Sequence, residues 1–258
     1  MKDVDRGSVA IHCSTAFAMD VVIQGDCIEV MRSWPDGCVN AIITDPPYGI
    51  TQNEWDSVPD LESWWREAWR VCSGVVVMTA NQPFTSEVVM SQRKWFKWAD
   101  VWHKSQARGH LNAKVMPLRE HEDILVFGKG RVTYNPQFSA KPLENIRPNT
   151  PRTKQTGCYG DHGLDSERSV DVDVSYPRSV VKFNNDQSGL HPTQKPQKLF
   201  EYLIQTYTNE GEVVCDPFGG SGTTAAAAKN TGRRYVSIEA KADYVEIQRQ
   251  RLAQGVLF

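Results

Sequence analysis

The stretch that decides the fold is Val213-Val214-Cys215-Asp216-Pro217-Phe218-Gly219-Gly220-Ser221-Gly222-Thr223-Thr224. Its apolar start predicts a buried strand, its glycines predict a tight turn, and its last residues predict the first turn of a helix. Glycines let a backbone approach a ligand closely, and the unpaired N–H groups at a helix start face an anionic group. This order favours a nucleotide site, although a tight turn without a ligand has the same pattern.

A second predicted strand, residues 234–239, ends in a carboxylate. Glu239 follows Gly219 by 20 residues, the separation at which a βαβ nucleotide site carries its ribose-hydroxyl acceptor. Only 36 residues follow Gly222, which are too few to complete a doubly wound sheet. The remaining strands must therefore come earlier in the chain, so the sequence predicts a circularly permuted order with the cofactor strand late and the chemistry early.

Apolar runs alternate with helical patterns through the rest of the chain. Strands are expected at 21–23, 39–44, 74–79, 98–104 and 123–127, and helices at 28–34, 61–72, 83–90 and 200–207. This alternation predicts an α/β fold with a mostly parallel sheet. Residues 1–18 show no clear period and are expected to be an N-terminal extension, with a single catalytic domain at 19–258.

The bulk composition is that of an ordinary globular protein. The chain of 258 residues has a net charge of −2, which argues against a uniformly basic coat for nucleic acid. Its six cysteines form no C-x-x-C pair, so reduced, buried thiols are expected. No apolar run is long enough to span a bilayer and the first residues lack the order of a signal peptide, so a soluble, cytoplasmic protein without membrane association is expected.

The middle of the chain is locally basic. From Arg93 to Lys154 there are 13 Lys and Arg residues against 5 Asp and Glu residues. Such asymmetry suggests a surface that faces phosphates, although a solvated face without a partner has the same composition. Residues 140–190 are poor in apolar periodicity, which predicts a long loop or a small insertion.

A second motif, Asp45-Pro46-Pro47-Tyr48, follows the predicted strand 39–44, at the strand end where open α/β sheets bind ligands. Its prolines fix φ and remove two N–H donors, so the remaining polar atoms are mainly acceptors. A carboxylate and a proline carbonyl held in this way suit both hydrogens of an –NH₂ group, and the tyrosine ring offers a face for stacking. A proline-stiffened turn without a ligand is the alternative.

With both motifs in view, the chain resembles the beta class of amino-group DNA methyltransferases, which use S-adenosylmethionine. In that class a D-P-P-Y motif comes first, a target-recognition region follows, and a D-P-F-x-G-S-G-T cofactor motif comes late. A third signature of the class, His191-Pro192-Thr193-Gln194-Lys195-Pro196, stands just upstream of the glycine-rich motif. The resemblance covers roughly Val21 to Leu252.

The resemblance implies a Rossmann-like, doubly wound, mostly parallel sheet with a target-recognition region inserted at about 105–190. It also implies a role for each matching residue. Asp45, Pro46, Pro47 and Tyr48 would hold and stack the target base. Asp216, Phe218, Gly219, Gly220, Ser221, Gly222 and Thr223 would form the pocket for the methionine part of the cofactor, Glu239 would accept its ribose hydroxyls, Asp26 and Cys27 would lie near its adenine, and His191, Thr193 and Lys195 would enclose its carboxylate. An aspartate placed like Asp26 is more often a helix cap.

The implied reaction is direct methyl transfer to the amino nitrogen of a base flipped out of duplex DNA. Lys104, Arg108, Asn112, Lys114 and Arg119 are candidates for DNA contact on charge and residue type. In the class an aspartate at the first motif position goes with adenine N6 and a serine with cytosine N4, so Asp45 favours adenine and cytosine N4 is the alternative. No metal site is expected, because the spacing around His110 and His121 matches none.

Other classes of protein fit the sequence less well. A nicotinamide dehydrogenase would need its glycine loop early and would leave the D-P-P-Y motif without a role. An RNA or protein-glutamine methyltransferase and an inactive DNA-binding module remain alternatives. The recognition sequence cannot be read from the middle region, and a homodimer and a cognate restriction endonuclease stay open as partners beside double-stranded DNA.

Overall fold

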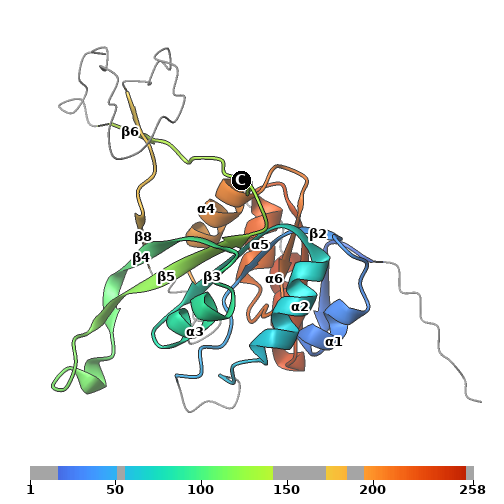
Figure 1. Cartoon of the computed structure of the whole chain (residues 1–258), viewed down its shortest axis with the longest axis horizontal. Coiled ribbons are helices and arrows are strands. Elements are labelled where there is room, and N and C mark those ends of the chain that lie inside the picture. Colours follow the sequence, from blue (N-terminus) through green and yellow to red (C-terminus); the bar gives the residue numbers. More distant parts are fainter. Residues whose placement is uncertain (1–16, 51–55, 142–172, 185–194, 254–258) are drawn as a thin grey trace, which may run out of the picture.

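The computed structural model describes residues 17–50, 56–141, 173–184 and 195–253. Its centre is an eight-stranded sheet in the order β1-β10-β9-β2-β3-β5-β4-β8 (Figure 1). The strands are β1 (Val21–Gln24), β2 (Val39–Thr44), β3 (Cys72–Ala80), β4 (Phe96–Arg108), β5 (Arg119–Gly128), β8 (Val180–Phe183), β9 (Val213–Asp216) and β10 (Arg234–Glu239). The first five in spatial order run parallel, β5 is antiparallel to both β3 and β4, and β8 is parallel to β4.

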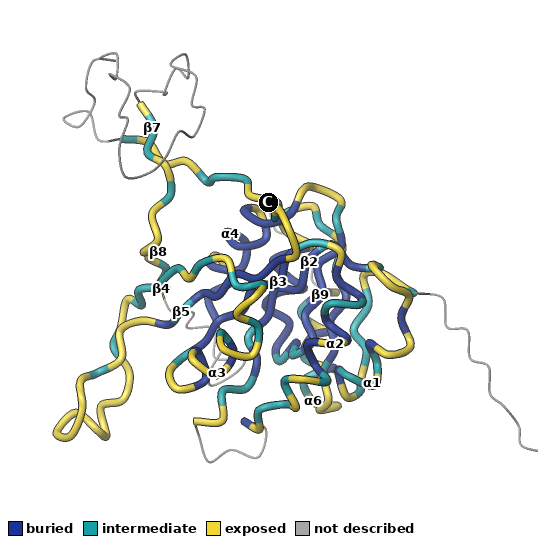
Figure 2. Tube along the Cα trace, in the orientation of Figure 1, coloured by how far each residue is buried: buried dark blue, intermediate teal, exposed yellow. Residues whose placement is uncertain are grey.

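Helices cover both faces of this sheet. One face carries α1 (Cys27–Arg32), α2 (Leu61–Val71) and α3 (Phe84–Ser91), and the other carries α4 (Gln197–Tyr207), α5 (Thr223–Asn230) and α6 (Ala242–Ala253). Strand β2 shows why. Ile42 packs in the core beneath α1, α2 and α3, whereas Ala41 and Ile43 pack in the core beneath α4 and α5. Successive side chains of a strand point to opposite faces, so a strand covered on both sides is apolar throughout. The buried strands form the centre of Figure 2.

Helix α2 turns its tryptophans toward the sheet, as their helical spacing predicts. Trp64 and Trp65 are fully buried, and Trp65 meets Phe127 of β5 with ring centroids 5.0 Å apart. The helix begins after Asp60, whose side chain accepts a hydrogen bond from the Ser63 N–H, which satisfies one of the free donors of its first turn. These tryptophans are therefore core residues and not a ligand-binding face.

The order of the strands creates a switch point between β9 and β2. From β9 the chain passes through α5 to β10 on one side, and from β2 it passes through α2 to β3 on the other. Open α/β sheets bind ligands outside the carboxyl ends of the strands at such a point. The predicted fold class, including its permuted strand order, is confirmed: β9 follows six of the other strands of this sheet in sequence yet pairs with β2 near the middle of the sheet.

Two expectations about the middle of the chain need correction. Strands β4 and β5 are longer than expected and continue as a hairpin beyond the body of the protein (Figure 1). Residues 140–190 are not all loop, because β7 (Val174–Ser175) pairs with β6 (Ser139–Ala140) and β8 pairs with β4. These strands are short and carry no long apolar period, so they could not be predicted from the sequence. Residues 142–172 and 185–194, and most of the expected extension 1–18, lie outside the described residues.

The described part of the chain contains no helix that is both long and apolar enough to cross a membrane. The same residues bring together no group of three or more His, Cys, Asp or Glu side chains that could hold a metal ion. Cys27, Cys38, Cys72 and Cys215 are free thiols, and burial raises the pKa of each.

Candidate active site

The two sequence motifs meet at the carboxyl ends of β2 and β9. The Thr44 hydroxyl donates a 2.6 Å hydrogen bond to Asp216 Oδ1, which also accepts from the Phe218 N–H at 3.0 Å. The other oxygen of Asp216 accepts from the Thr224 hydroxyl at the start of α5. Burial raises the pKa of Asp216 to about 6, against the opposing effect of these hydroxyl donors. This buried carboxylate links the D-P-P-Y strand to the glycine turn, and its expected role at the cofactor stays a prediction.

The carboxylate of Asp45 is held from two sides. Its Oδ1 accepts hydrogen bonds from the Tyr48 hydroxyl at 2.6 Å and from the Thr79 hydroxyl, and its Oδ2 accepts one from Lys195 Nζ at 2.7 Å. The Asp45 side chain remains 25% exposed, whereas that of Lys195 is 9% exposed. Since each carboxylate oxygen has two lone pairs, Oδ2 retains one acceptor position that none of the described residues occupies.

A second acid, Glu122 of β5, joins this group. Its Oε1 pairs with Lys104, and its Oε2 lies 3.3 Å from Lys195 Nζ and 3.2 Å from the Tyr48 hydroxyl. Burial alone would raise the pKa of Glu122, but Lys195 and Lys104 outweigh it and hold that pKa below its usual value. Burial likewise opposes the charge of Lys195, yet Asp45 and Glu122 raise its pKa. Two carboxylates and two ammonium groups thus form a neutral, largely buried cluster.

Sequence reasoning missed Glu122, although a signal was present. Residues 122, 124 and 126 share one face of β5, and Ile124 and Val126 are core residues. A carboxylate at the next inward position of a buried strand needs a partner, because an unpaired buried charge is very costly. Lys195, expected at the cofactor carboxylate, supplies that partner together with Lys104.

Tyr48 is fixed both by its ring and by its hydroxyl. The ring stacks on Phe84 with centroids 5.5 Å apart and an interplanar angle of 27°, and Lys195 Nζ lies 5.3 Å from its centre. Burial, with the neighbouring Asp45 and Glu122, raises the pKa of Tyr48 well above its usual value, so the hydroxyl stays protonated and donates. Pro46 is buried and Pro47 half-buried in the same corner.

Asp56 holds the loop that follows the D-P-P-Y motif. Its carboxylate accepts hydrogen bonds from the N–H groups of Tyr48, Gly49 and Ile50 at 2.7, 2.8 and 2.9 Å. Gly49 has φ +67°, and a Cβ there would lie 2.9 Å from Val58 Cγ2. The role of Asp56 could not be predicted from the sequence, because it depends on contacts with backbone N–H groups that only the folded chain brings close.

The glycine turn packs tightly against β10 and α6. A Cβ on Gly219 would lie 2.1 Å from Ser237 Oγ and 2.7 Å from Gln248 Nε2, so a larger residue does not fit there. Gln248 donates to the Gly220 carbonyl at 3.0 Å, and Gly220 and Gly222 have φ of +49° and +80°. The following residues Ser221 and Thr223 are buried, and Arg251 bonds the carbonyl of the first and the hydroxyl of the second.

Glu239 is coupled to this turn. Its Oε2 accepts from the Gly220 N–H at 2.9 Å and its Oε1 accepts from the Lys241 N–H at 2.8 Å. Within the part of the chain that the structure describes, each oxygen retains a lone pair for a further donor. On the neighbouring strand end, Asp26 Oδ1 accepts from the N–H groups of Ile28 and Glu29, so Asp26 is the N-cap of α1.

The adjacent strands β1, β10, β9 and β2 thus end, in that order, at Asp26, Glu239, the glycine turn and Asp45. Cys27 is buried, and burial together with Asp26 raises the pKa of its thiol to about 12. That side chain packs in the core beneath α1. His191 and Thr193 lie outside the described residues. The cofactor roles expected for all these residues remain predictions.

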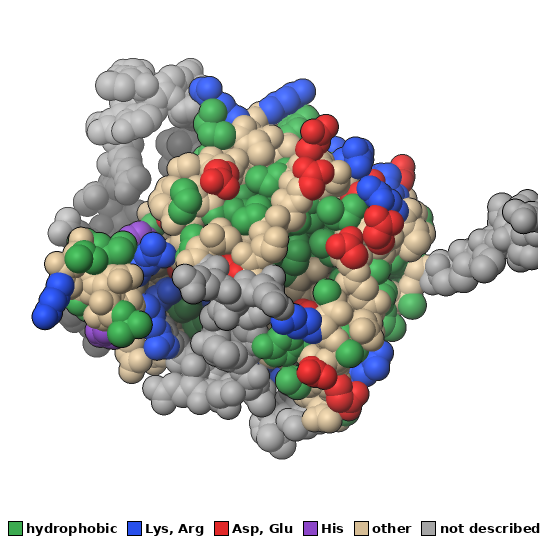
Figure 3. All heavy atoms as spheres, turned by 90° about the horizontal axis from the view of Figure 1, so that it is seen from below, with side chains coloured by type: hydrophobic (Ala, Val, Ile, Leu, Met, Phe, Trp, Pro, Cys, Tyr) green, Lys and Arg blue, Asp and Glu red, His purple; other side chains and the backbone are tan. Residues whose placement is uncertain are grey.

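The candidates for DNA contact divide into two groups. The prediction that Lys104 contacts DNA is wrong. Its side chain is 9% exposed and pairs with Glu122, so it is not available to a phosphate. Arg108, Asn112, Lys114 and Arg119 are exposed on the projecting β4–β5 hairpin, at whose tip lies the short 3₁₀ turn His110–Asn112. Figure 3 shows Lys, Arg and His side chains gathered on this hairpin at the left of the view. Their contact with DNA stays a prediction.

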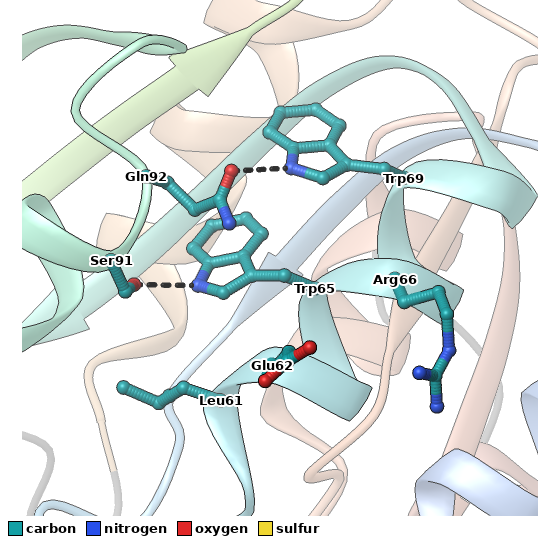
Figure 4. A pocket seen from close by; sticks show the side chains of 7 residues that line it. All are labelled: Leu61, Glu62, Trp65, Arg66, Trp69, Ser91 and Gln92. Carbon is teal, nitrogen blue, oxygen red and sulfur yellow. Dashed lines mark hydrogen bonds between the residues drawn. The ribbon is translucent and has the colours of Figure 1, made fainter.

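A hollow of about 450 Å³ lies between α2 and the end of α3. The Trp65 and Trp69 indole N–H groups in it donate to Ser91 Oγ and Gln92 Oε1 at 3.0 and 3.1 Å (Figure 4). These bonds join the two helices and leave no indole donor free. None of the residues predicted for catalysis or binding lines this hollow.

Comparison with known proteins gives consistent matches. The family model described as DNA methylase matches residues 39–250. The type II methyltransferase M2.DpnII of Streptococcus pneumoniae is 47% identical, over 90% of this chain and 89% of that protein. The DNA adenine methyltransferase YhdJ of Escherichia coli strain K12 is 28% identical, over 90% and 82%.

Two solved structures share the fold. The M1.HpyAVI–SAM complex has a TM-score of 0.61 at 24% identity and covers 90% of this chain and 98% of that one. The cytosine-N4-specific PvuII DNA methyltransferase has a TM-score of 0.62 at 17% identity and covers 92% and 87%.

Proposed function

The chain belongs to the DNA methylase family, and we propose that this DNA methyltransferase transfers a methyl group from S-adenosylmethionine to the N6 amino group of adenine in duplex DNA. The observation that carries the proposal is the meeting of Asp45 with the glycine turn at neighbouring strand ends, joined through Asp216. A methyl donor in the turn and an amino group at Asp45 would then lie side by side.

The residues around the turn fit this cofactor. Glu239 offers acceptor positions to two ribose hydroxyls from a carboxylate that backbone N–H groups already orient. The half-buried Phe218 ring packs against Trp64 with centroids 6.2 Å apart, which gives the turn an apolar wall. The first-turn N–H groups of α5 have no partner within the helix and suit a carboxylate. The donor set thus matches a ribose, an apolar chain and an anionic end.

When bound, S-adenosylmethionine supplies a methyl carbon on a positively charged sulfur, and transfer forms an N–C bond as the S–C bond breaks and leaves a neutral thioether. The protein prepares the nitrogen. Its lone pair is delocalised into the base ring, and acceptors outside the ring plane free that lone pair. Asp45 Oδ2 and the Pro46 carbonyl would accept the two amino hydrogens, and the Tyr48 ring would stack on the base. After transfer the nitrogen carries a positive charge and loses one proton to Asp45 or to water.

The choice of adenine rests on the aspartate at the first position of the motif. In the class that the chain resembles, an aspartate at this position goes with adenine and a serine goes with cytosine. One relative is named as a DNA adenine methyltransferase. Both bases present an exocyclic amine, so methylation of cytosine N4 is the second candidate, and a cytosine-N4-specific enzyme shares the fold.

We also propose that residues 19–258 form one catalytic domain and that about 105–190 supplies its target-recognition region. Arg108, Lys114 and Arg119 on the hairpin would face phosphates. A homodimer and a cognate restriction endonuclease remain expectations from the resemblance, as does a cytoplasmic location.

The test is methyl transfer to unmethylated duplex DNA with tritium-labelled cofactor, followed by digestion to nucleosides. Label in N6-methyldeoxyadenosine is expected, and label in N4-methyldeoxycytidine would overturn the choice of base. Asp45→Ala should abolish transfer, whereas Asp243→Asn, an exposed carboxylate on α6, should leave it unchanged. Labelled RNA or protein in place of DNA would contradict the DNA substrate, and full activity of Asp45→Ala would exclude the mechanism.

A further inference from the structure

A neutral cluster of four charged side chains lies behind the proposed base-binding corner. Lys195 stands between the two acids, 2.7 Å from Asp45 Oδ2 and 3.3 Å from Glu122 Oε2. Lys104 pairs with the other oxygen of Glu122. The side chains of Lys104, Lys195 and Glu122 are 7–9% exposed and that of Asp45 is 25% exposed, so only Asp45 opens toward a substrate.

The hydrogen bonds of Asp45 limit how it can receive an amino group. Both lone pairs of Oδ1 are directed at the Tyr48 and Thr79 hydroxyls. Among the described residues, only Lys195 donates a hydrogen bond to Oδ2, so an amino hydrogen must approach Oδ2, beside the positive charge of that ammonium group. The nitrogen gains positive charge as it is methylated, and like charges repel strongly where few waters screen them.

Glu122 offers Lys195 a second position. Because Lys104 holds Glu122 Oε1, the carboxylate stays in place with Oε2 turned toward Lys195. Lys195 Nζ lies 2.7 Å from Asp45 Oδ2 and 3.3 Å from Glu122 Oε2, so a small movement of the ammonium would make Glu122 the nearer partner and weaken the hold of Lys195 on Asp45. The ammonium remains paired throughout, so the shift avoids the cost of an unpaired buried charge.

We propose that Glu122 is a positioning residue for methyl transfer, which holds Lys195 and takes its ammonium from Asp45 Oδ2 when the amino group of the base binds. The inference rests on the proposed function and deepens it. In the resting protein Lys195 orders Asp45, and with the base present Asp45 Oδ2 is released to accept the amino hydrogen.

The first variant is Glu122→Gln, which keeps the shape of the side chain and removes the second anionic position for Lys195. We expect kcat to fall about ten- to hundred-fold, the loss typical of one charge-assisted hydrogen bond, with much smaller changes in KM for DNA and cofactor. Steady-state transfer of labelled methyl groups to a duplex measures both. A kcat equal to that of the wild type would overturn the proposal.

Glu122→Gln also removes the ion-pair partner of Lys104. A second variant must therefore distinguish a role of Glu122 in methyl transfer from a role in stability alone. The double variant Glu122→Gln/Lys104→Gln restores neutrality and should recover the thermal stability lost in the single variant while its kcat stays low. Recovery of both stability and kcat would mean that Glu122 only neutralises Lys104, and the proposal would be wrong.

Glu122→Asp gives an independent measurement that does not depend on how the double variant folds. It keeps the charge but withdraws the carboxylate by one methylene from Lys195. We expect a lowered kcat, and wild-type turnover in this variant would contradict the proposal. An inactive wild-type protein would instead remove the proposed function, so the two failures are distinguishable.

Discussion

The Thr44 hydroxyl donates a 2.6 Å hydrogen bond to the Asp216 carboxylate, across 172 positions of sequence. Both side chains are almost completely buried, at 1% and 4% exposure. Thr44 is the last residue of β2 before Asp45, and Asp216 is the last residue of β9 before the glycine turn. This hydrogen bond thus joins the corner proposed to hold the base to the turn proposed to hold the methyl donor, at the end of the paired strands β2 and β9.

Replacement of Thr44 by valine tests this link, because valine keeps the shape and removes the donor. Asp216 then loses one of its two hydroxyl partners, so we expect a loss of about 1–3 kcal/mol in the free energy of unfolding, measured by urea denaturation. Methyl transfer should also slow. Thr44→Ser keeps the hydroxyl and is the control, and equal stability of the valine and serine variants would contradict the assignment.

The pKa of Asp216 predicts a specific dependence of stability on pH. Burial raises it from its ordinary value of 3.8 to about 6, so the folded protein binds a proton there that the unfolded chain releases. The native state is therefore relatively more stable at low pH, and this advantage is lost as pH rises from about 4 through about 6. The full effect is about 3 kcal/mol for a shift of this size.

Asp216→Asn isolates that contribution, because the amide is neutral at every pH. The unfolding free energy of the wild type minus that of the variant should fall as pH rises from about 4 to about 6 and then level off. Taking the difference removes the opposite trend of Glu122, whose pKa is lowered. A difference that is flat across this interval, in denaturant titrations at matched pH values, would contradict the raised pKa.

The elements that the sequence predicted best are those with continuous apolar residues between polar ends. Strands 39–44 and 234–239 have the bounds expected, because burial on both faces gives each a largely apolar centre. The outer parts of β4 and β5 were missed, since their exposed polar residues are paired through backbone bonds that leave no period in the sequence.

The candidate site was predictable only where a motif carries its own chemistry. Asp45 and Glu239 were found because a strand end and a fixed spacing mark them. Thr79 and Glu122 reach Asp45 or its partners from positions 34 and 77 residues further along the chain, and only the folded sheet brings them together. Lys104 was misjudged for the same reason, because charge alone does not distinguish a buried ion pair from a surface cation.

Gly219→Ala tests the packing of the glycine turn. The new Cβ would lie 2.1 Å from Ser237 Oγ, so the turn must shift, and overpacking of this kind costs about 1–3 kcal/mol. We expect a lower melting temperature and weaker cofactor binding, measured by calorimetry. Ser237 Oγ is buried without a hydrogen-bond partner among the described residues, so adding Ser237→Ala should restore part of the stability. An alanine variant as stable as the wild type would contradict the close packing.

Glu239→Gln tests the proposed ribose acceptor. The amide replaces one oxygen that now accepts from the Gly220 or Lys241 N–H, so the orientation of the group and one acceptor are lost together. Cofactor affinity should fall about tenfold or more, in keeping with the loss of a charged hydrogen-bond acceptor. Glu246→Gln, on the exposed side of α6, is the control. Unchanged affinity in isothermal titration of Glu239→Gln would remove this residue from the cofactor site.

The projecting hairpin makes the DNA interface accessible to a measurement of salt dependence. Each cation that contacts a phosphate releases a counterion, so the logarithm of the DNA affinity falls with the logarithm of salt concentration by about 0.9 per contact. Arg108→Ala and Lys114→Ala should each weaken binding to any duplex and reduce that slope by about one, measured by fluorescence anisotropy at several salt concentrations. Arg249→Ala, an exposed cation on α6, should leave the slope unchanged. If both hairpin variants keep the wild-type slope, the phosphates lie against another surface of the protein.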